Sequence, residues 1–371
     1  MAKNTAIICE FNPLHNGHKA ILAHAGKEGN AVIAIMSGNF TQRSEGAVFD
    51  KYKRARLAVS MGADAVLELP FPWCSASGEF FALGGVGIAA GLGIDSFVFG
   101  SETGDTDYVK RASRLTVSEA CSAADNKLGA AVSSDNFLRS HGISLSSNDK
   151  LAAEYMRAAV RLGITADFSA YKRMTADGFY RSATDIRQMI YDGEDFSPFV
   201  PTETIDVCGR TSDIRDGALE DILFHFYRIK TEPSYNVFDA AGGVGERLAV
   251  SAAKSHSGSE FFRLAATKKY TNSRLRRAAL FSLLGVSKSD LTSPPAFTVL
   301  LAANEKGRRF LADTKKTRSI AVLTKPSDFS PSDESEKRQY DLWCRADEVY
   351  SLCLRQVQTS GEYLRRSPAI L

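Results

Sequence analysis

Apolar runs and amphipathic stretches alternate along the first half of the chain. Four short apolar runs typical of buried β-strands lie at residues 5–9, 31–36, 65–69 and 96–99. Helical patterns cover about residues 50–61 and 79–90, and another helix is expected to begin near Gly17. This alternation predicts an N-terminal doubly wound, Rossmann-like α/β domain, with a parallel sheet covered by helices on both faces. Ligands of such sheets bind at the carboxyl ends of the strands.

The pattern changes after residues 198–201, where helical periodicity takes over. A helix is expected over residues 216–230, and helices dominate to about residue 286. The remaining elements are expected as a strand at 297–301, a helix at 304–313, a strand at 319–323, a loop at 325–336 and a helix at 337–353. We therefore predict an α/β catalytic domain over residues 1–200. A basic, mainly helical domain with a small α/β element should follow over residues 201–371.

Composition narrows the class of protein. With 44% hydrophobic and 24% charged residues, the chain has enough apolar material for sizeable cores. Its start lacks the pattern of a signal peptide, and no run of about 18 apolar residues suggests a membrane span. The six cysteines, among them Cys121, are scattered and form no CxxC pair, which argues against a zinc site or a disulfide framework. We expect a cytoplasmic protein without a membrane partner.

Positive charge is concentrated in the second half. The net charge is only +3, but residues 263–325 contain fourteen Lys or Arg and three acidic residues. Such a stripe favours a polyanionic partner. A solvated basic face is the alternative interpretation.

The strongest candidate chemistry follows the first strand, in the segment CEFNPLHNGH. His15 and His18 lie in a strand-to-helix turn, and Gly17 lets a nucleotide approach the backbone. The helix start offers backbone N–H groups to a phosphate, and the two imidazoles add donors. Together they could bind the α-phosphate of ATP while pyrophosphate leaves. The histidines could instead be metal ligands or structural groups.

A second candidate is the segment RSATDIR. Ser182 or Thr184 can cap the helix that begins there, and Arg187 can offer a charged fork to the β- and γ-phosphates. In isolation, the segment is only a capped helix with an arginine. Together with the histidine loop it is typical of ATP-dependent nucleotidyltransferases.

Other strand ends should face the same pocket. Gly100 follows the fourth strand and permits close approach of an adenine or ribose, while Asn148 precedes a helix that begins near Lys150. After the second strand, polar groups could hold a carboxylate or a nucleobase; these are Ser37, Gly38, Asn39 and Gln42. Plain turns and helix caps are the alternative interpretation.

A dense basic run with one aromatic residue enters a helix near residue 272. Its expected RNA contacts are Lys268, Lys269, Tyr270, Arg274, Arg276 and Arg277. Lys and Arg would contact phosphates in a salt-sensitive manner, and the tyrosine could stack on a base. The alternative is an amphipathic helix with a basic solvent face.

Several blocks resemble the bacterial tRNA(Met) cytidine acetate ligase family of the HxGH nucleotidyltransferase superfamily. They are ICEFNPLHNGH, IMSGNFTQR, DKYKRARLAVSMGADAVLELPFP, FGSE, SND, YKR, SATDIR, GERL and KKYTNSRLRRAALFSLLG. The blocks occur in family order over almost the whole chain. The third and last blocks are much more specific than the histidine motif.

The resemblance implies a two-step reaction with ATP and Mg²⁺. Acetate attacks the α-phosphate to give acetyl-adenylate and pyrophosphate. The N4 amine of the wobble cytidine of elongator tRNA(Met) then takes the acetyl group and releases AMP. No DNA partner is implied.

By the same resemblance, the ATP loop runs from residue 7 to residue 20, with further nucleotide contacts from Gly100, Asn148 and Arg173. The expected loop contacts are Ile7, Cys9, Glu10, Phe11, Asn12, Pro13, Asn16, Gly17 and Ala20.

Two other functions stay open at this stage. A small-molecule adenylyltransferase, acting on a nicotinamide or pantetheine phosphate, would also use the HxGH and SxTxIR pair, but it would not need a wide basic face. An RNA-binding protein could bind ATP only as a ligand. The chain departs from the usual family pattern at Leu14, Ser44, Gly46 and Ala76. These departures leave the exact acyl donor open. The sequence also does not identify a general base for the second step.

Overall fold

The computed structural model describes residues 4–27, 29, 31–115, 136–173, 181–230 and 237–371; Cys121 lies outside these ranges. Its centre is an eight-stranded sheet with strand order β5-β4-β1-β2-β3-β6-β7, to which β8 is added beside β6. The strands are β1 (Thr5–Cys9), β2 (Val32–Ser37), β3 (Ala65–Leu69), β4 (Ser96–Ser101), β5 (Asp167–Lys172), β6 (Phe297–Ala303), β7 (Ala321–Leu323) and β8 (Ala369–Ile370). Strands β1 to β4 are parallel, as predicted, and β5, which was not predicted, pairs parallel with β4.

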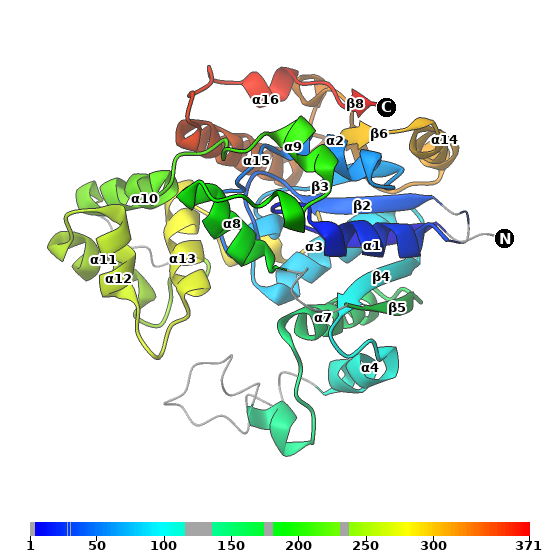
Figure 1. The fold of residues 1–371 in the computed structure, drawn as a ribbon. Helices are drawn as coiled ribbons and strands as arrows, with labels where there is room; N and C mark the ends of the chain where they lie inside the picture. Colours follow the sequence, from blue (N-terminus) through cyan, green and yellow to red (C-terminus); the bar gives the residue numbers. More distant parts are fainter. Residues whose placement is uncertain (1–3, 28, 30, 116–135, 174–180, 231–236) are drawn as a thin grey trace.

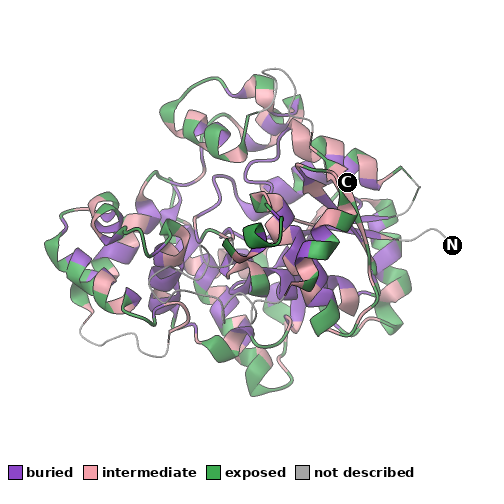
Figure 2. Cartoon of the chain, turned by 90° about the horizontal axis from the view of Figure 1, so that it is seen from below, coloured by how far each residue is buried: buried purple, intermediate pink, exposed green. Residues whose placement is uncertain are grey.

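Helices cover both faces of this sheet (Figure 1). In the first half they are α1 (Asn16–Ala25), α2 (Lys51–Ser60), α3 (Gly78–Gly91), α4 (Thr106–Arg114), α7 (Ser147–Arg161), α8 (Ala183–Asp192) and α9 (Thr202–Cys208). Alternate residues of β2 enter two separate cores: Ile33 and Ile35 pack with α3 and α7, and Ala34 packs with α1 and α2. Because both faces are covered, the central strands are apolar without alternation. Figure 2 shows buried residues gathered in the interior and exposed residues toward the outside.

A helical lobe stands to one side of the sheet in Figure 1. It consists of α10 (Ala218–Ile229), α11 (Val244–Lys254), α12 (Gly258–Ala265) and α13 (Asn272–Leu284). Aromatic side chains fill its interior, where Phe261 is fully buried against Phe224 and Tyr227. The lobe places the basic run beside the sheet edge at which the parallel strands end.

The chain then returns to the sheet, through β6 to β8 and the helices α14 (Glu305–Asp313), α15 (Glu334–Cys353) and α16 (Glu362–Arg365). Strand β6 pairs antiparallel with β3 and so covers an edge that would otherwise expose unpaired backbone groups. This differs from the predicted boundary at residue 200. The last elements extend the first sheet, and the helical lobe is an excursion between two parts of one α/β body.

Candidate active site

A cleft of about 1060 Å³ lies where the parallel strands end, and it extends to the start of α13. Most of the predicted site residues line it: Ile7, Cys9, Glu10, Phe11, Asn12, His15, Gly17, His18, Gln42, Gly100, Asn148, Arg173, Ser182, Thr184, Arg187 and Arg277. Pro13, Asn16 and Ala20 are not among the lining residues. The position of the cleft follows from topology, because parallel strands bring their carboxyl ends to one edge.

The two histidines form a stacked pair at the start of α1. Their ring centroids lie 3.7 Å apart with an interplanar angle of 22°. His15 caps the helix, since its Nδ1 accepts the Gly17 N–H at 3.1 Å, and the His15 N–H donates to His18 Nδ1 at 3.3 Å. The Gly17 amide is therefore already engaged inside the turn. A phosphate bound at this turn would therefore be contacted by the imidazoles more than by that amide.

Burial keeps both imidazoles neutral. It lowers the pKa of His15 to about 4, and the nearby positive charge of Arg173 adds to the effect. The pKa of His18 lies well below its usual value because of burial, with contributions from His15 and Arg173. Each Nδ1 accepts a hydrogen bond, so the proton of each neutral ring is on Nε2. The pair thus offers two N–H donors rather than two cations.

Arg173 lies close enough to influence both histidines, and it also pairs with Glu102 at 3.3 Å. The Asn148 side chain donates to the same carboxylate at 2.7 Å. Gly100 stands beside them, because a Cβ there would lie 3.5 Å from Arg173 Cδ and 3.1 Å from Ile21 Cδ1. These three predicted nucleotide contacts therefore lie together at the end of β4.

The start of α8 forms the other side of the cleft. Ser182 and Asp185 form a capping box, and Ala183 and Thr184 of the first turn line the cleft. Arg187 donates to the Asn12 carbonyl at 2.9 Å and to Thr184 Oγ1 at 3.2 Å. The guanidinium and the positive end of the helix dipole therefore face the same space as the histidines.

Some predicted loop contacts have structural partners. Asn12 accepts the Val48 N–H through Oδ1 at 2.9 Å, and the Asn16 side chain donates to the Pro198 carbonyl at 3.3 Å. Cys9 Sγ faces the Ile35 carbonyl at 3.8 Å. These side chains shape the loop around the histidines.

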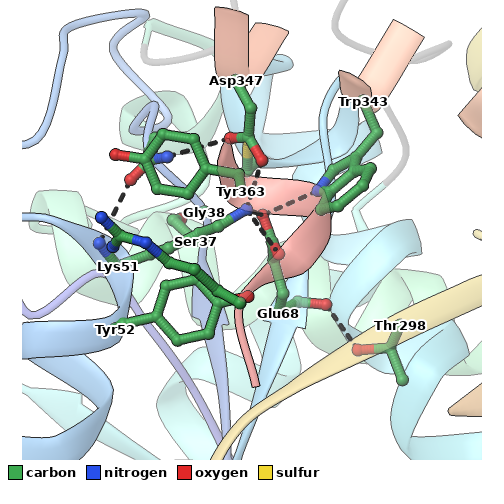
Figure 3. A network of polar contacts seen from close by, with 12 residues as sticks. Ser37, Gly38, Lys51, Tyr52, Glu68, Thr298, Trp343, Asp347 and Tyr363 are labelled. Carbon is green, nitrogen blue, oxygen red and sulfur yellow. Dashed lines mark hydrogen bonds and ion pairs between the residues drawn. The ribbon is translucent and has the colours of Figure 1, made fainter. Parts of the chain in front are cut away.

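Three of the four residues predicted to hold a carboxylate or nucleobase do not line the cleft. Ser37, Gly38 and Asn39 lie in a buried polar network around Lys51, Glu68 and Asp347 (Figure 3). Asn39 donates to Asp347 at 2.9 Å, and a Cβ on Gly38 would collide with the Glu68 carboxylate. The prediction is wrong for these three because α15 packs over the end of β2. Gln42 does line the cleft.

The basic run is only partly exposed. Tyr270 is 9% exposed, and its hydroxyl donates to the Gly242 carbonyl, so its ring is not available to stack on a base. Arg277 is buried and pairs with Asp239. Arg276 pairs with Glu220 at 2.8 Å and with Glu45 at 3.5 Å. Lys268, Lys269 and Arg274 keep more of their surface.

Two residues at the site were not predicted. Arg54 is fully buried and donates to the backbone carbonyls of Glu10, Ser37, Gly38 and Phe49. It thereby ties together the ends of β1 and β2. Glu45 faces Arg187 at 3.6 Å and Arg276 at 3.5 Å, which joins the α8 side of the cleft to the helical lobe. In the sequence, Arg54 lies in an ordinary helical pattern and Glu45 lies in a loop, so neither position indicated a role at the site.

Known proteins are similar to this chain in both amino-acid sequence and fold. The family model for HIGH Nucleotidyl Transferase matches residues 2–363. A tRNA(Met) cytidine acetate ligase of Caldanaerobacter subterraneus subsp. tengcongensis is 30% identical, over 95% of this chain and 96% of that protein. The chain belongs to the tRNA(Met) cytidine acetate ligase family, among the HIGH nucleotidyl transferases. This confirms the resemblance read from the sequence blocks.

Further members of the acetate ligase family agree with this result. The Thermoanaerobacter pseudethanolicus tRNA(Met) cytidine acetate ligase is 29% identical over 96% of both chains. The crystal structure of Thermotoga maritima TmcAL bound with alpha-thio ATP superimposes with a TM-score of 0.89 at 28% identity, covering 100% of this chain and 99% of that one. The predicted α/β fold class is thereby confirmed.

The described residues contain neither a membrane-spanning helix nor a cluster of metal-ligating side chains. No helix among them has the length and apolar character needed to cross a bilayer. Within the same residues, no three His, Cys, Asp or Glu side chains gather in a way that could hold a metal ion.

Proposed function

We propose that this chain is an ATP-dependent ligase that acetylates the N4 amine of the wobble cytidine in elongator tRNA(Met). The observation that carries the proposal is the stacked pair of neutral histidines opposite Arg187, in a cleft that continues to the basic helical lobe. Supporting it are the family membership and the alpha-thio ATP bound to the Thermotoga maritima relative.

In the first step, one acetate oxygen attacks the α-phosphorus of ATP. A new O–P bond forms as the bond to the β-phosphate oxygen breaks, and pyrophosphate leaves. The Nε2–H groups of His15 and His18 donate to the α-phosphate oxygens as their charge grows. Arg187 and the start of α8 hold the leaving pyrophosphate. Gly100, Asn148 and Arg173 hold the nucleoside.

The described residues offer no dedicated carboxylate cage for Mg²⁺. We therefore assign no step to the ion; Mg²⁺ commonly reaches such sites on the phosphates of the nucleotide. The rest of the step depends on positioning and on hydrogen bonds from the chain.

In the second step, the cytidine N4 attacks the acetyl carbonyl of the adenylate. The C–N bond forms, the bond to the AMP oxygen breaks, and N4 loses a proton. Lys268, Lys269 and Arg274 lie on the helical lobe in the segment whose Thr271 and Ser273 line the cleft, and they are proposed to contact tRNA phosphates. Arg276 and Arg277 are proposed to hold the loop of Gln42 and Glu45 against that lobe, since both bond to it.

A small-molecule adenylyltransferase is the alternative. Such an enzyme would use the same histidine turn and α8 start, but it gives no reason for a cleft continuous with a basic lobe.

The reaction that tests the proposal contains the protein, ATP, Mg²⁺, acetate and unmodified tRNA(Met). Mass spectrometry of the digested tRNA should detect N4-acetylcytidine only when ATP and acetate are both present. ATP turnover without acetylcytidine would overturn the assignment.

A further inference from the structure

The N-terminus of α3 opens into the cleft. Helix α3 runs antiparallel to β1 and packs closely on it, because a Cβ on Gly85 would lie 2.7 Å from Ile8 Cδ1. One to two turns earlier, Phe81 and Gly78 therefore lie near the carboxyl end of β1, where Glu10 and the histidine turn begin. Ser77, Gly78 and Phe81 all line the cleft.

This helix start lacks internal partners. Ser77 is the N-cap, yet its side chain makes no capping hydrogen bond. Within the described part of the chain, the backbone N–H groups of Gly78 and Glu79 donate to no acceptor. A helix of fourteen residues therefore directs its positive end and unpaired donors into a ligand cleft.

Tyr155 adds an independent donor. It lies on α7, which contacts the start of α3, since a Cβ on Gly78 would lie 3.6 Å from Glu154 Cγ and 3.8 Å from Leu151 Cδ1. Tyr155 is only 5% exposed and lines the cleft. Its hydroxyl bonds to no other described residue and is not among the side-chain atoms fully enclosed by protein, so it is open to a ligand in the cleft.

The remaining walls suit a small apolar group. Phe81 is 1% exposed, and its side chain and that of Ile8 line the cleft on the side of the sheet that faces α3. A methyl group would find van der Waals contact there. A longer alkyl chain would meet the packed core behind Phe81.

The acidic side chains near the start of α3 would not prevent an anion from binding there. Glu154 pairs with Arg157 at 2.5 Å, and Glu79 pairs with Arg161 at 3.2 Å. Glu10 accepts the Gln42 N–H at 2.7 Å, and burial raises the pKa of its carboxyl, which reduces its negative charge. Arg43 and Arg277 also line the cleft.

We infer that the start of α3, with Ser77 and Gly78, and the Tyr155 hydroxyl form the subsite for the carboxylate of a short monocarboxylic acid, whose methyl group rests on Phe81. The inference rests on the proposed function and names residues for its acyl substrate. One carboxylate oxygen is held at this subsite, and the other is free to attack the α-phosphorus above the histidine pair.

The test is Tyr155→Phe, assayed by acetate-dependent exchange of labelled pyrophosphate into ATP. Loss of a hydrogen bond to a charged group corresponds to a rise of about ten- to hundredfold in the KM for acetate. The KM for ATP should stay the same. The melting temperature should not fall, because the lost hydroxyl has no partner in the protein. Tyr340→Phe is the matched control, since its hydroxyl bonds to the Pro326 carbonyl outside the cleft.

Two further variants test the same subsite independently of Tyr155. Ser77→Ala should raise the KM for acetate severalfold, and Phe81→Leu should raise the ratio of kcat/KM for propionate over acetate by about tenfold. An unchanged KM for acetate in both Tyr155→Phe and Ser77→Ala would overturn the subsite. A KM that rises for tRNA instead of acetate would also overturn it. If the unmodified protein shows no acetate-dependent exchange, the proposed function fails as well.

Discussion

Lys51→Met tests the buried network that joins helix α15 to the loop after β2. Lys51 Nζ lies 2.9 Å from Glu68 and 2.6 Å from Asp347, and its side chain is completely buried. It also stands 4.6 Å from the centre of the Trp343 ring (Figure 3). Burial opposes its charge, but the two carboxylates outweigh burial and raise the pKa of Lys51. Methionine would keep the packing and leave both acids without a cationic partner.

Removing one partner of a buried ion pair costs about 3–5 kcal/mol. Unfolding entropy of roughly 2.1 cal/mol/K per residue gives about 0.8 kcal/mol/K for 371 residues, so the melting temperature should fall by about 5 °C. Lys53→Met is the control on the same helix. Lys53 pairs with Asp213 but is 41% exposed, so its loss should cost under about 1 kcal/mol.

The cost of Lys51→Met should also depend on pH. Burial raises the pKa of Asp347 to about 7, although Lys51 opposes that rise. A raised carboxyl pKa means that the folded state binds more protons than the unfolded state, so this group's contribution to stability falls as pH rises from about 4 through 7. Without Lys51, the pKa of Asp347 should lie even higher. The loss of stability caused by Lys51→Met should therefore be smaller at pH 5 than at pH 8. Thermal unfolding at both pH values measures this. A loss of under about 1 kcal/mol, or an equal loss at both pH values, would refute the reasoning.

Two further predictions concern the cleft and the helical lobe. His18→Ala should slow acetyl-adenylate formation by about a hundredfold or more and leave tRNA affinity nearly unchanged. Because the pKa of His15 is about 4 and that of His18 is well below its usual value, neither ring should gain a proton near pH 6.5; a histidine titration there in the adenylation rate would contradict this. Lys268→Ala with Lys269→Ala should weaken tRNA binding and flatten its salt dependence in filter-binding assays. Tyr270→Phe should leave tRNA affinity unchanged and lower stability by about 1 kcal/mol, since its hydroxyl bonds to Gly242; an unchanged melting temperature would contradict this role.

The local pattern of the chain was enough to predict most strands and helices of the α/β body, although not β5, and to select the histidine turn and the α8 start as candidates. The predicted strands at residues 5–9 and 65–69 have those limits in the structure. The histidine turn and the α8 start lie at one cleft, as their places at element ends suggested. Strand periodicity, helix caps and turn residues depend on neighbours in sequence, and the carboxyl ends of parallel strands always share an edge.

Contacts between distant segments were not predictable in the same way. Strand β6 looked like part of a second domain, but it pairs antiparallel with β3. Asn39 looked like a pocket residue, and its bond to Asp347 spans 308 positions of the chain. Arg54 and Tyr155 resembled ordinary helix residues.

The amino-acid pattern thus determined which elements form and which candidate phosphate-binding turns they carry, because these properties arise within a few residues. Three-dimensional packing determined which polar side chains reach the cleft. Ser37 and Tyr270 are covered by, or bonded to, segments far from them in sequence, whereas the hydroxyl of Tyr155 is left without a partner beside the start of α3. Burial is a property of all the segments that meet at one point, and no single stretch of sequence contains them all.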